Sequence, residues 1–172
     1  MRIVAGKFGG RNLTPPSDSR VRPTAEAVRA ELLDMLGTDV DKARVLDLFA
    51  GTGALGLEAI SRGAISADFV ETRPSSLHAL KANIAKLRLR ERTRVFKRDA
   101  LPFAAALVKN SYDIAFVDPP YESRMLDRVI ESWHATHFAR VLAVEHATVH
   151  VIPQGAVQRT LDDTSITIYR AP

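Results

Sequence analysis

Short apolar runs and regularly spaced apolar positions divide this chain into alternating strands and helices. Runs rich in Val, Ile, Leu and Phe are typical of buried parallel strands, and apolar residues three and four positions apart are typical of amphipathic helices. We expect strands at residues 44–50, 67–70, 93–97, 112–117, 141–145, 157–161 and 165–169. We expect helices at residues 25–36, 57–64, 74–87, 101–109 and 123–133. This alternation predicts an α/β fold, a Rossmann-like sheet with helices on both faces.

The first residues stand apart from this alternation. Apolar residues on both sides of Gly9-Gly10 predict a small β-hairpin. Thr24 is a suitable N-cap for the helix that follows. We therefore expect an N-terminal basic extension over residues 1–23 and a main domain over residues 24–172.

The composition narrows the class of protein. The chain has 172 residues, enough for one hydrophobic core, and no cysteine, which excludes disulfides and thiolate metal sites. It has no apolar run long enough to span a membrane and no apolar N-terminal stretch typical of a secretory signal. Its histidines lack flanking ligands at metal-binding spacing. We therefore expect a cytoplasmic protein without a metal.

The positive charge is concentrated at the N-terminus. The net charge is +4, and residues 1–29 account for all of it, with six Lys or Arg against Asp18 and Glu26. Such a segment is typical of a surface that binds nucleic-acid phosphates, although a solvated extension has the same composition. The candidate RNA-binding residues are Arg2, Lys7, Arg11, Arg20, Arg22 and Arg29. A second basic cluster, at residues 86–98, fits an RNA contact and a solvated helix end equally well.

A glycine-rich turn follows the first strand of the sheet. Residues 44–50 lead directly into a glycine turn and then a helix, an arrangement that brings the backbone close to a nucleotide. Glu71 ends the next strand, twenty residues after Gly51, where a carboxylate can accept hydrogen bonds from both hydroxyls of a ribose. A nicotinamide dinucleotide would use the same pattern. The candidate nucleotide-binding residues here are Ala50, Gly51, Gly53 and Glu71.

Two further carboxylates belong to the same candidate site. Asp47 lies inside an otherwise apolar strand, where a buried carboxylate requires a polar partner. That partner is either the amino group of a methionine moiety or the backbone amides of the neighbouring loop. Asp99 and Ala100 follow the third strand, where Asp99 is placed to bind the amino group of an adenine. These residues complete a predicted cofactor site at the carboxyl ends of the strands.

The fourth strand ends in Asp118-Pro119-Pro120-Tyr121, and this tetrapeptide predicts the reaction. An exocyclic amino group of a nucleobase is a poor nucleophile, because its lone pair is delocalised into the ring. The carboxylate of Asp118 and the carbonyl of Pro119 can each accept one of its N–H bonds, which frees the lone pair for an electrophilic methyl group. The prolines restrict the direction of that carbonyl, and Tyr121 offers a ring on which an unpaired base can stack. The four residues are also ordinary in a turn after a strand, so alone they leave both interpretations open.

Taken together, these motifs resemble those of the class I S-adenosylmethionine-dependent methyltransferases. More narrowly, the whole chain resembles the RsmD-type 16S ribosomal RNA guanine-N2 methyltransferases, through residues 1–6, residues 22–24 with Arg29, residues 53–59 and residues 166–170. The resemblance implies a seven-stranded, mostly parallel sheet and S-adenosylmethionine as cofactor. It also implies that the acceptor is the N2 of a guanine in 16S ribosomal RNA. We expect the partner to be this RNA within a small-subunit ribosomal particle, and we expect a monomer.

Three alternatives remain open on the sequence. A DNA adenine-N6 or cytosine-N4 amino-methyltransferase shares both motifs, but such enzymes usually carry a separate target-recognition region, and the 51 residues after Tyr121 must complete the sheet. A nicotinamide-dependent reductase would explain the glycine turn and leave Asp118 without a role. A non-catalytic RNA-binding module would explain only the basic N-terminus.

Overall fold

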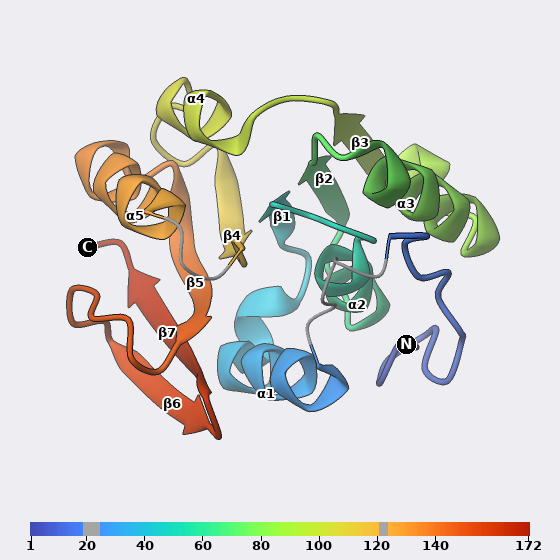
Figure 1. Ribbon diagram of the computed structural model, residues 1–172, viewed down its shortest axis with the longest axis horizontal. Coiled ribbons are helices and arrows are strands. Elements are labelled where there is room, and N and C mark those ends of the chain that lie inside the picture. Colours follow the sequence, from blue (N-terminus) through green and yellow to red (C-terminus); the bar gives the residue numbers. More distant parts are fainter. Residues whose placement is uncertain (19–24, 121–123) are drawn as a thin grey trace.

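The computed structural model describes residues 1–18, 25–120 and 124–172, and a seven-stranded sheet forms its centre (Figure 1). The strands lie in the order β3-β2-β1-β4-β5-β7-β6. The strands are β1 (Arg44–Leu48), β2 (Ser66–Val70), β3 (Thr93–Phe96), β4 (Tyr112–Val117), β5 (Ala139–Ala147), β6 (Val157–Leu161) and β7 (Thr164–Arg170). β1 to β5 pair in parallel, and β7 is antiparallel to both of its neighbours. The predicted strands and the mostly parallel Rossmann-like fold are therefore confirmed.

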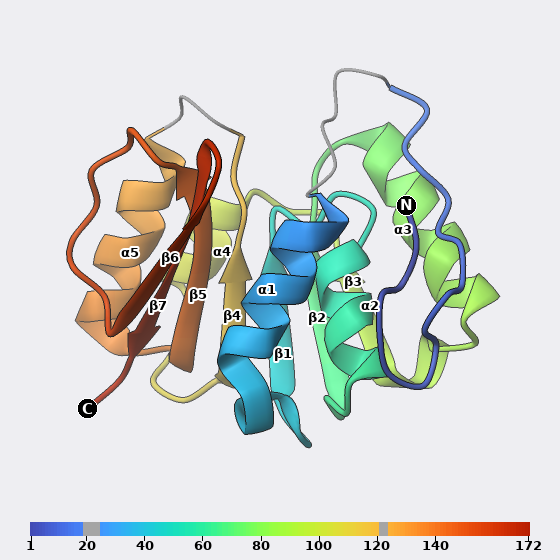
Figure 2. The same ribbon diagram turned by 90° about the horizontal axis from the view of Figure 1, so that it is seen from below.

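Helices cover both faces of this sheet. The described helices are α1 (Glu26–Leu36), α2 (Ala54–Ser61), α3 (Pro74–Lys86), α4 (Ala100–Ala105) and α5 (Met125–Thr136), with short 3-10 helices η1 (Gly37–Val40) and η2 (Arg90–Arg92). Side chains of α1, α2 and α3 share one hydrophobic core with the sheet, and those of α4 and α5 share a second core. Figure 2 shows α1 and α2 in front of the sheet and α4 behind it. Successive strand residues, such as Ile114 and Ala115 of β4, alternate between the two cores because their side chains point to opposite faces.

The register of the parallel strands brings their carboxyl ends to one edge of the sheet. Leu48, the last residue of β1, pairs with Val70 at the end of β2 and with Val117 at the end of β4. Val70 pairs in turn with Phe96 at the end of β3. The segments that follow these four strands therefore start side by side, as a shared site in an open α/β sheet requires.

Several element boundaries differ from those expected. α4 ends at Ala105, before residue 109, and β5 begins two residues earlier than predicted, at Ala139. Ala25 is the N-cap of α1 and makes no side-chain cap hydrogen bond, while Thr24 lies outside the described residues. No helix of the described ranges is both long and apolar enough to cross a bilayer.

The N-terminal arm, residues 1–18, packs against the main fold and forms only a rudimentary hairpin. In the described residues, its two segments are joined by one isolated antiparallel bridge, between Arg2 and Asn12. Its apolar side chains Ile3, Phe8 and Leu13 are buried in the same core as α1 and α2. Figure 2 shows the arm in dark blue beside α2 and α3. The arm therefore shares its hydrophobic core with the main α/β fold, although a boundary at residue 23 stays a prediction.

The turn of the arm lies in direct contact with the end of α2. The carbonyl of Ser61 accepts a hydrogen bond from the Lys7 N–H at 2.8 Å, and the Ser61 hydroxyl accepts one from the Phe8 N–H at 2.9 Å. Gly6, with φ 79°, is so close that an added Cβ would lie 2.0 Å from the Ser61 carbonyl oxygen. Only glycine allows both this backbone angle and so close a contact with the Ser61 carbonyl, so a side chain at position 6 would push the turn away from α2.

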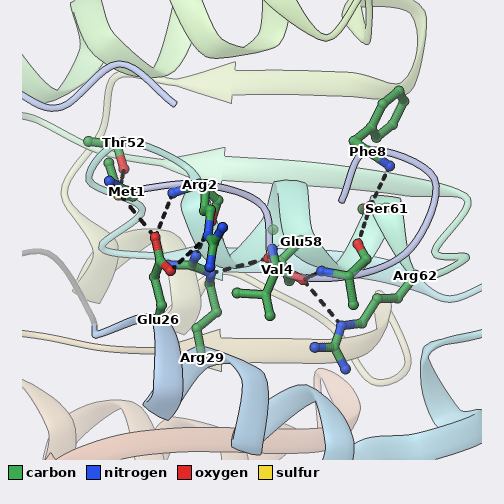
Figure 3. A network of polar contacts seen from close by, with 12 residues as sticks. Met1, Arg2, Val4, Phe8, Glu26, Arg29, Thr52, Glu58, Ser61 and Arg62 are labelled. Atoms are coloured by element: carbon green, nitrogen blue, oxygen red, sulfur yellow. Dashed lines mark hydrogen bonds and ion pairs between the residues drawn. The ribbon is translucent and has the colours of Figure 1, made fainter. Parts of the chain in front are cut away.

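A buried carboxylate, Glu58 of α2, joins the arm to two helices (Figure 3). It accepts hydrogen bonds from the backbone N–H groups of Val4, at 2.8 Å, and Ala5, at 2.9 Å. It also pairs with Arg29 of α1, at 3.4 Å, and with Arg62, at 3.3 Å. The side chains of Glu58 and Arg29 are both fully buried. Each charge therefore depends on the other, because an uncompensated charge in the interior is strongly destabilising.

This network corrects one prediction made from the sequence. Arg29 was expected to contact RNA, but its side chain is fully buried, and its guanidinium also donates to the carbonyl oxygen of Arg2. The prediction for Arg29 is wrong, because a side chain with no exposed surface cannot reach an RNA phosphate. Local composition does not distinguish a structural arginine from a surface arginine.

We expect Glu58→Gln to lower the free energy of unfolding by about 3–5 kcal/mol, because it leaves the Arg29 guanidinium buried without a counter-charge. Urea denaturation at neutral pH measures this loss. The matched control is Glu31→Gln, which breaks a more exposed pair with Arg159 and should cost less than about 1 kcal/mol. Equal losses from the two substitutions would contradict the importance given to Glu58.

Candidate active site

A cavity of about 450 Å³ opens at the carboxyl edge of the parallel strands. The segments that follow β1, β2, β3 and β4 line it, together with the start of α3 and two residues of the arm, Met1 and Pro16. Among the residues predicted from the sequence, it brings together Asp47, Ala50, Gly51, Glu71, Asp99, Ala100, Asp118, Pro119 and Pro120. The groups expected to hold a cofactor and those expected to hold a base therefore line one common space. Tyr121 lies outside the described residues.

The turn after β1 brings the main chain to the cavity wall. Phe49, Gly51 and Gly53 have positive φ angles of 60°, 55° and 79°. Glycine adopts such angles without strain, whereas phenylalanine rarely does. Gly53 is not among the cavity-lining residues, and an added Cβ there would lie 2.3 Å from Cδ1 of Leu80. The structure gives Gly53 a packing role in the turn, and its contact with a cofactor stays a prediction.

Asp47 lies deep in the cavity wall and is almost fully buried. Its Oδ2 accepts a hydrogen bond from the Gly56 N–H at 3.0 Å, so one of the two expected partners, a loop amide, is present. An added Cβ on Gly56 would lie 2.5 Å from Cε1 of Phe69, which explains why glycine occupies this position. Burial raises the pKa of Asp47 well above its usual range, and the negative charges of Asp118 and Glu71 raise it further. A cationic ligand at this wall would relieve that energetic cost.

Glu71 connects the glycine turn to the start of α3. Its Oε2 accepts a hydrogen bond from the Gly51 N–H at 2.8 Å. Its Oε1 accepts from the backbone N–H groups of Thr72, at 2.7 Å, and Arg73, at 2.8 Å. The carboxylate is therefore held in one orientation at the rim of the cavity before any ligand binds.

Asp99 and Asp118 occupy the remaining strand ends. Asp99 is the N-cap of α4 and accepts a hydrogen bond from the Leu101 N–H at 3.1 Å, which fixes an otherwise exposed carboxylate. Asp118 directly follows β4 and is half-buried, and Pro119 beside it is buried. Among the described residues, five carboxylates and two arginines, Arg73 and Arg98, line the cavity, and this excess of acidic groups favours a cationic ligand over an anionic one.

Comparison with known proteins places this site in a family. Residues 1–163 match the family described as conserved hypothetical protein 95. The chain belongs to this family. The ribosomal RNA small subunit methyltransferase D of Escherichia coli is 38% identical over 130 residues, which cover 76% of this chain and 65% of that protein. The resemblance to RsmD-type methyltransferases is thereby confirmed.

Solved structures agree with this membership. The hypothetical protein TTHA0928 of Thermus thermophilus is 29% identical, with a TM-score of 0.84 over 99% of both chains. The 16S rRNA N2 methyltransferase RsmC of T. thermophilus, solved with AdoMet and guanosine, is 20% identical, with a TM-score of 0.70 over 91% of this chain and 45% of that one. At that identity RsmC shows the shared fold alone.

Several cavity residues of this family member were missed by the sequence analysis, namely Met1, Pro16, Phe49, Ser76, Arg98, Glu145 and Thr164. Ser76, in the first turn of α3, is the most informative of them. Its hydroxyl is fully buried and has no hydrogen-bond partner in the described part of the chain. Buried hydroxyls are normally hydrogen-bonded, so a ligand in the cavity is a natural partner. Ser76 could have been found from the sequence, because a helix begins just after Glu71. Nothing in the sequences of β5 and β7 indicated that Glu145 and Thr164 line the cavity.

The predicted RNA-binding residues have different surroundings. Arg2, Lys7 and Arg11 are exposed, and Arg2 pairs with Glu26 at 3.3 Å. Arg20 and Arg22 lie outside the described residues, so their contacts stay predictions. In the described ranges, no group of three or more His, Asp or Glu side chains is arranged to hold a metal ion.

We expect Asp47→Asn to stabilise the ligand-free protein, by an amount that grows with pH. Burial raises the pKa of Asp47 above its ordinary value of 3.8, so the folded state keeps a proton that the unfolded state loses. The stability of the wild type therefore falls as the pH rises from 3.8 through the raised pKa. Asparagine removes this fall because it is uncharged, and its side-chain oxygen can still accept the hydrogen bond from the Gly56 N–H. Thermal unfolding between about pH 4 and about pH 8 measures the difference.

Asp113→Asn is the matched control, and we expect it to have the opposite effect on stability. Burial alone would raise the pKa of Asp113, but hydrogen bonds from Arg44 lower it below the usual range. This carboxylate therefore contributes stability that is present above its unfolded pKa and lost as the pH falls through the lowered one. Asp113→Asn should thus cost most at neutral pH. A pH-independent effect of Asp47→Asn would show that the buried charge is not its cause.

Proposed function

We propose that the protein transfers a methyl group from S-adenosylmethionine to the exocyclic N2 of a guanine in 16S ribosomal RNA. The observation that carries this proposal is the shared cavity, in which Asp118, Pro119 and Pro120 meet the glycine turn, Glu71 and Asp99. A cofactor site and a base-binding motif in one space allow a methyl donor and an amino acceptor to meet. Membership of a family that includes a ribosomal RNA small subunit methyltransferase supports the same conclusion.

The cavity wall suits S-adenosylmethionine, which supplies an electrophilic methyl group on a positively charged sulfur. Both Glu71 and Asp99 line the cavity. In this proposal Glu71 accepts hydrogen bonds from ribose hydroxyls, and Asp99 accepts one from an adenine amino group. The buried hydroxyl of Ser76 lacks a partner among the described residues, as expected of a side chain that completes its hydrogen bonds with a ligand.

Asp47 is the residue proposed to hold the amino group of the methionine moiety. A buried carboxylate with a raised pKa gains most from an adjacent cation, because the cation restores the charged form that burial disfavours. The excess of carboxylates around the cavity also supports S-adenosylmethionine over a nicotinamide dinucleotide, whose two phosphates carry negative charge.

Asp118 and the carbonyl of Pro119 are proposed to accept the two N2 hydrogens of the guanine. Both residues line the cavity at the end of β4, and two successive prolines limit the rotation of the backbone there. The guanine has to leave its stack to reach them, a cost of a few kcal/mol that is smallest for an unpaired base. Tyr121, although outside the described residues, is the proposed stacking partner.

The basic arm supports an RNA target. We propose that Arg2, Lys7 and Arg11, with Arg20 and Arg22, contact ribosomal RNA, and that a monomer acts on a small-subunit ribosomal particle in the cytoplasm. Labelled S-adenosylmethionine, incubated with such particles and with free 16S ribosomal RNA from a strain that lacks the protein, tests the substrate. Mass spectrometry then identifies the modified nucleoside. Label only in duplex DNA, or in no nucleic acid, would overturn the proposed function.

We expect Asp118→Ala to lower turnover by about 100 to 1,000-fold, because one preorganised acceptor for the reacting amino group is lost. Asp118→Asn should lower it less, since an amide oxygen still accepts a hydrogen bond. A methyl-transfer assay with labelled cofactor measures turnover, and calorimetry should give a nearly unchanged cofactor affinity for both variants. Full turnover in both would remove Asp118 from the reaction.

We expect Ser76→Ala to weaken cofactor binding by roughly 2 to 13-fold, corresponding to one net hydrogen bond of about 0.5–1.5 kcal/mol. The stability of the ligand-free protein should not fall, because this hydroxyl has no partner there among the described residues. Ser75→Ala is the matched control, since Ser75 is on the same helical turn but does not line the cavity. Equal affinities of the two variants for the cofactor would argue against the contact.

A further inference from the structure

A second hollow, of about 540 Å³, lies where the turn of the arm faces the end of α3 and the segment that leads to β3. We call it the basic groove, and its lining residues are Lys7, Phe8, Arg11, Lys86, Leu87, Arg88, Leu89 and Arg92. Five of these residues are cationic, and no Asp or Glu of the described chain is among them. The fold thus joins the two basic clusters that the sequence showed separately.

Four cations of the basic groove lack acidic partners within the described part of the chain. Lys7, Arg11, Lys86 and Arg88 are exposed, and none of them forms an ion pair with a carboxylate of the described residues. Several other arginines are paired within the protein, as in Arg44–Asp113, Arg62–Asp34, Arg94–Asp68, Arg159–Glu31 and Arg170–Asp39. The positive potential of the groove is therefore available to an external anion.

Packing holds the walls of the groove in place. Phe8 is buried between them, with the Lys7 ammonium 5.7 Å and the Arg11 guanidinium 5.6 Å from the centre of its ring. On the other wall, Arg92 donates to the carbonyl oxygens of Ile65, at 2.9 Å, and Ala64. Phosphate recognition benefits from such fixed cations, because less conformational entropy is lost on binding.

The arm connects the basic groove to the cavity of the candidate active site. Met1 and Pro16 line the cavity, while Lys7 and Arg11 between them line the groove. Lys7 lies six positions after Met1, so the Cα atoms of these two residues are at most about 22 Å apart. A nucleic-acid strand with one base in the cavity therefore has neighbouring nucleotides within reach of the groove.

We propose that the basic groove binds the phosphodiester backbone of the RNA substrate, beside the nucleotide that enters the cavity. This inference rests on the proposed function and adds Lys86, Arg88 and Arg92 to the RNA-binding surface. The turn of the arm contains two glycines and contributes only Lys7 and Arg11 to the groove. The end of α3 and the segment after it contribute the other cations. RNA is favoured over an acidic protein because the arm that lines the groove also lines a cavity that suits a nucleobase.

The test compares the double variants Lys7→Gln/Arg11→Gln and Lys86→Gln/Arg88→Gln with the wild type. For single-stranded RNA, each lost phosphate contact reduces the slope of log Kd against log salt concentration by about 0.7. At 0.1 M salt this corresponds to a loss of affinity of roughly 5-fold. We expect each double variant to lose about 1.4 in slope and about 25-fold in affinity for a 16S ribosomal RNA transcript. In methyl transfer, KM for RNA should rise while kcat and cofactor affinity stay unchanged.

The matched control is Lys109→Gln/Arg128→Gln, which removes the same charge from exposed positions outside the groove. Equal losses in this control, or unchanged slopes in both groove variants, would overturn the proposal. Weaker binding to ribosomal particles with unchanged binding to free RNA would also overturn it, by indicating a protein partner. Methyl transfer to RNA with unchanged slopes would refute only the groove, whereas groove-dependent RNA binding without methyl transfer would refute only the proposed function.

Discussion

The buried carboxylate of Glu58 is the interaction on which the working surface of this protein depends. It receives two backbone N–H groups from the arm and the charge of Arg29 from α1, and it belongs to the helix that begins at the glycine turn. This side chain thus fixes the arm, at Val4 and Ala5, to the helix that follows the glycine turn. Met1 in the cavity wall and Lys7 in the basic groove lie on either side of this contact.

The cavity and the basic groove differ in charge, so each is suited to a different part of a substrate. Carboxylates line the cavity, where a cationic methyl donor and a neutral base would meet, and that environment disfavours phosphate groups. Cations line the groove, where phosphates are favoured. An RNA substrate would therefore be oriented with its backbone on the groove side and one base directed into the acidic cavity. The arm, which contributes to both walls, keeps the two environments at a constant separation.

Much of the fold and half of the site could be predicted from the sequence, because the relevant signals are local. Parallel register places whatever follows β1, β2, β3 and β4 at one edge, so motifs directly after strands were enough to find Glu71 and Asp118. Contacts between distant segments were not predictable in this way. The residues around Arg29 in the sequence do not distinguish it from a surface arginine. Ser76 stands out only because the folded structure buries its hydroxyl, and the groove forms only where the arm meets α3.

The docking of the arm also orders the events of folding. Val4 and its partner Glu58 are 54 residues apart, so during synthesis the arm leaves the ribosome well before the helix that will hold it. Closing a loop of this length costs conformational entropy, which favours late formation of the contact. A nascent chain can therefore assemble its first strands with the cavity still open on the side of the arm. The part of the cavity wall that Met1 and Pro16 supply is therefore complete only when the arm has docked.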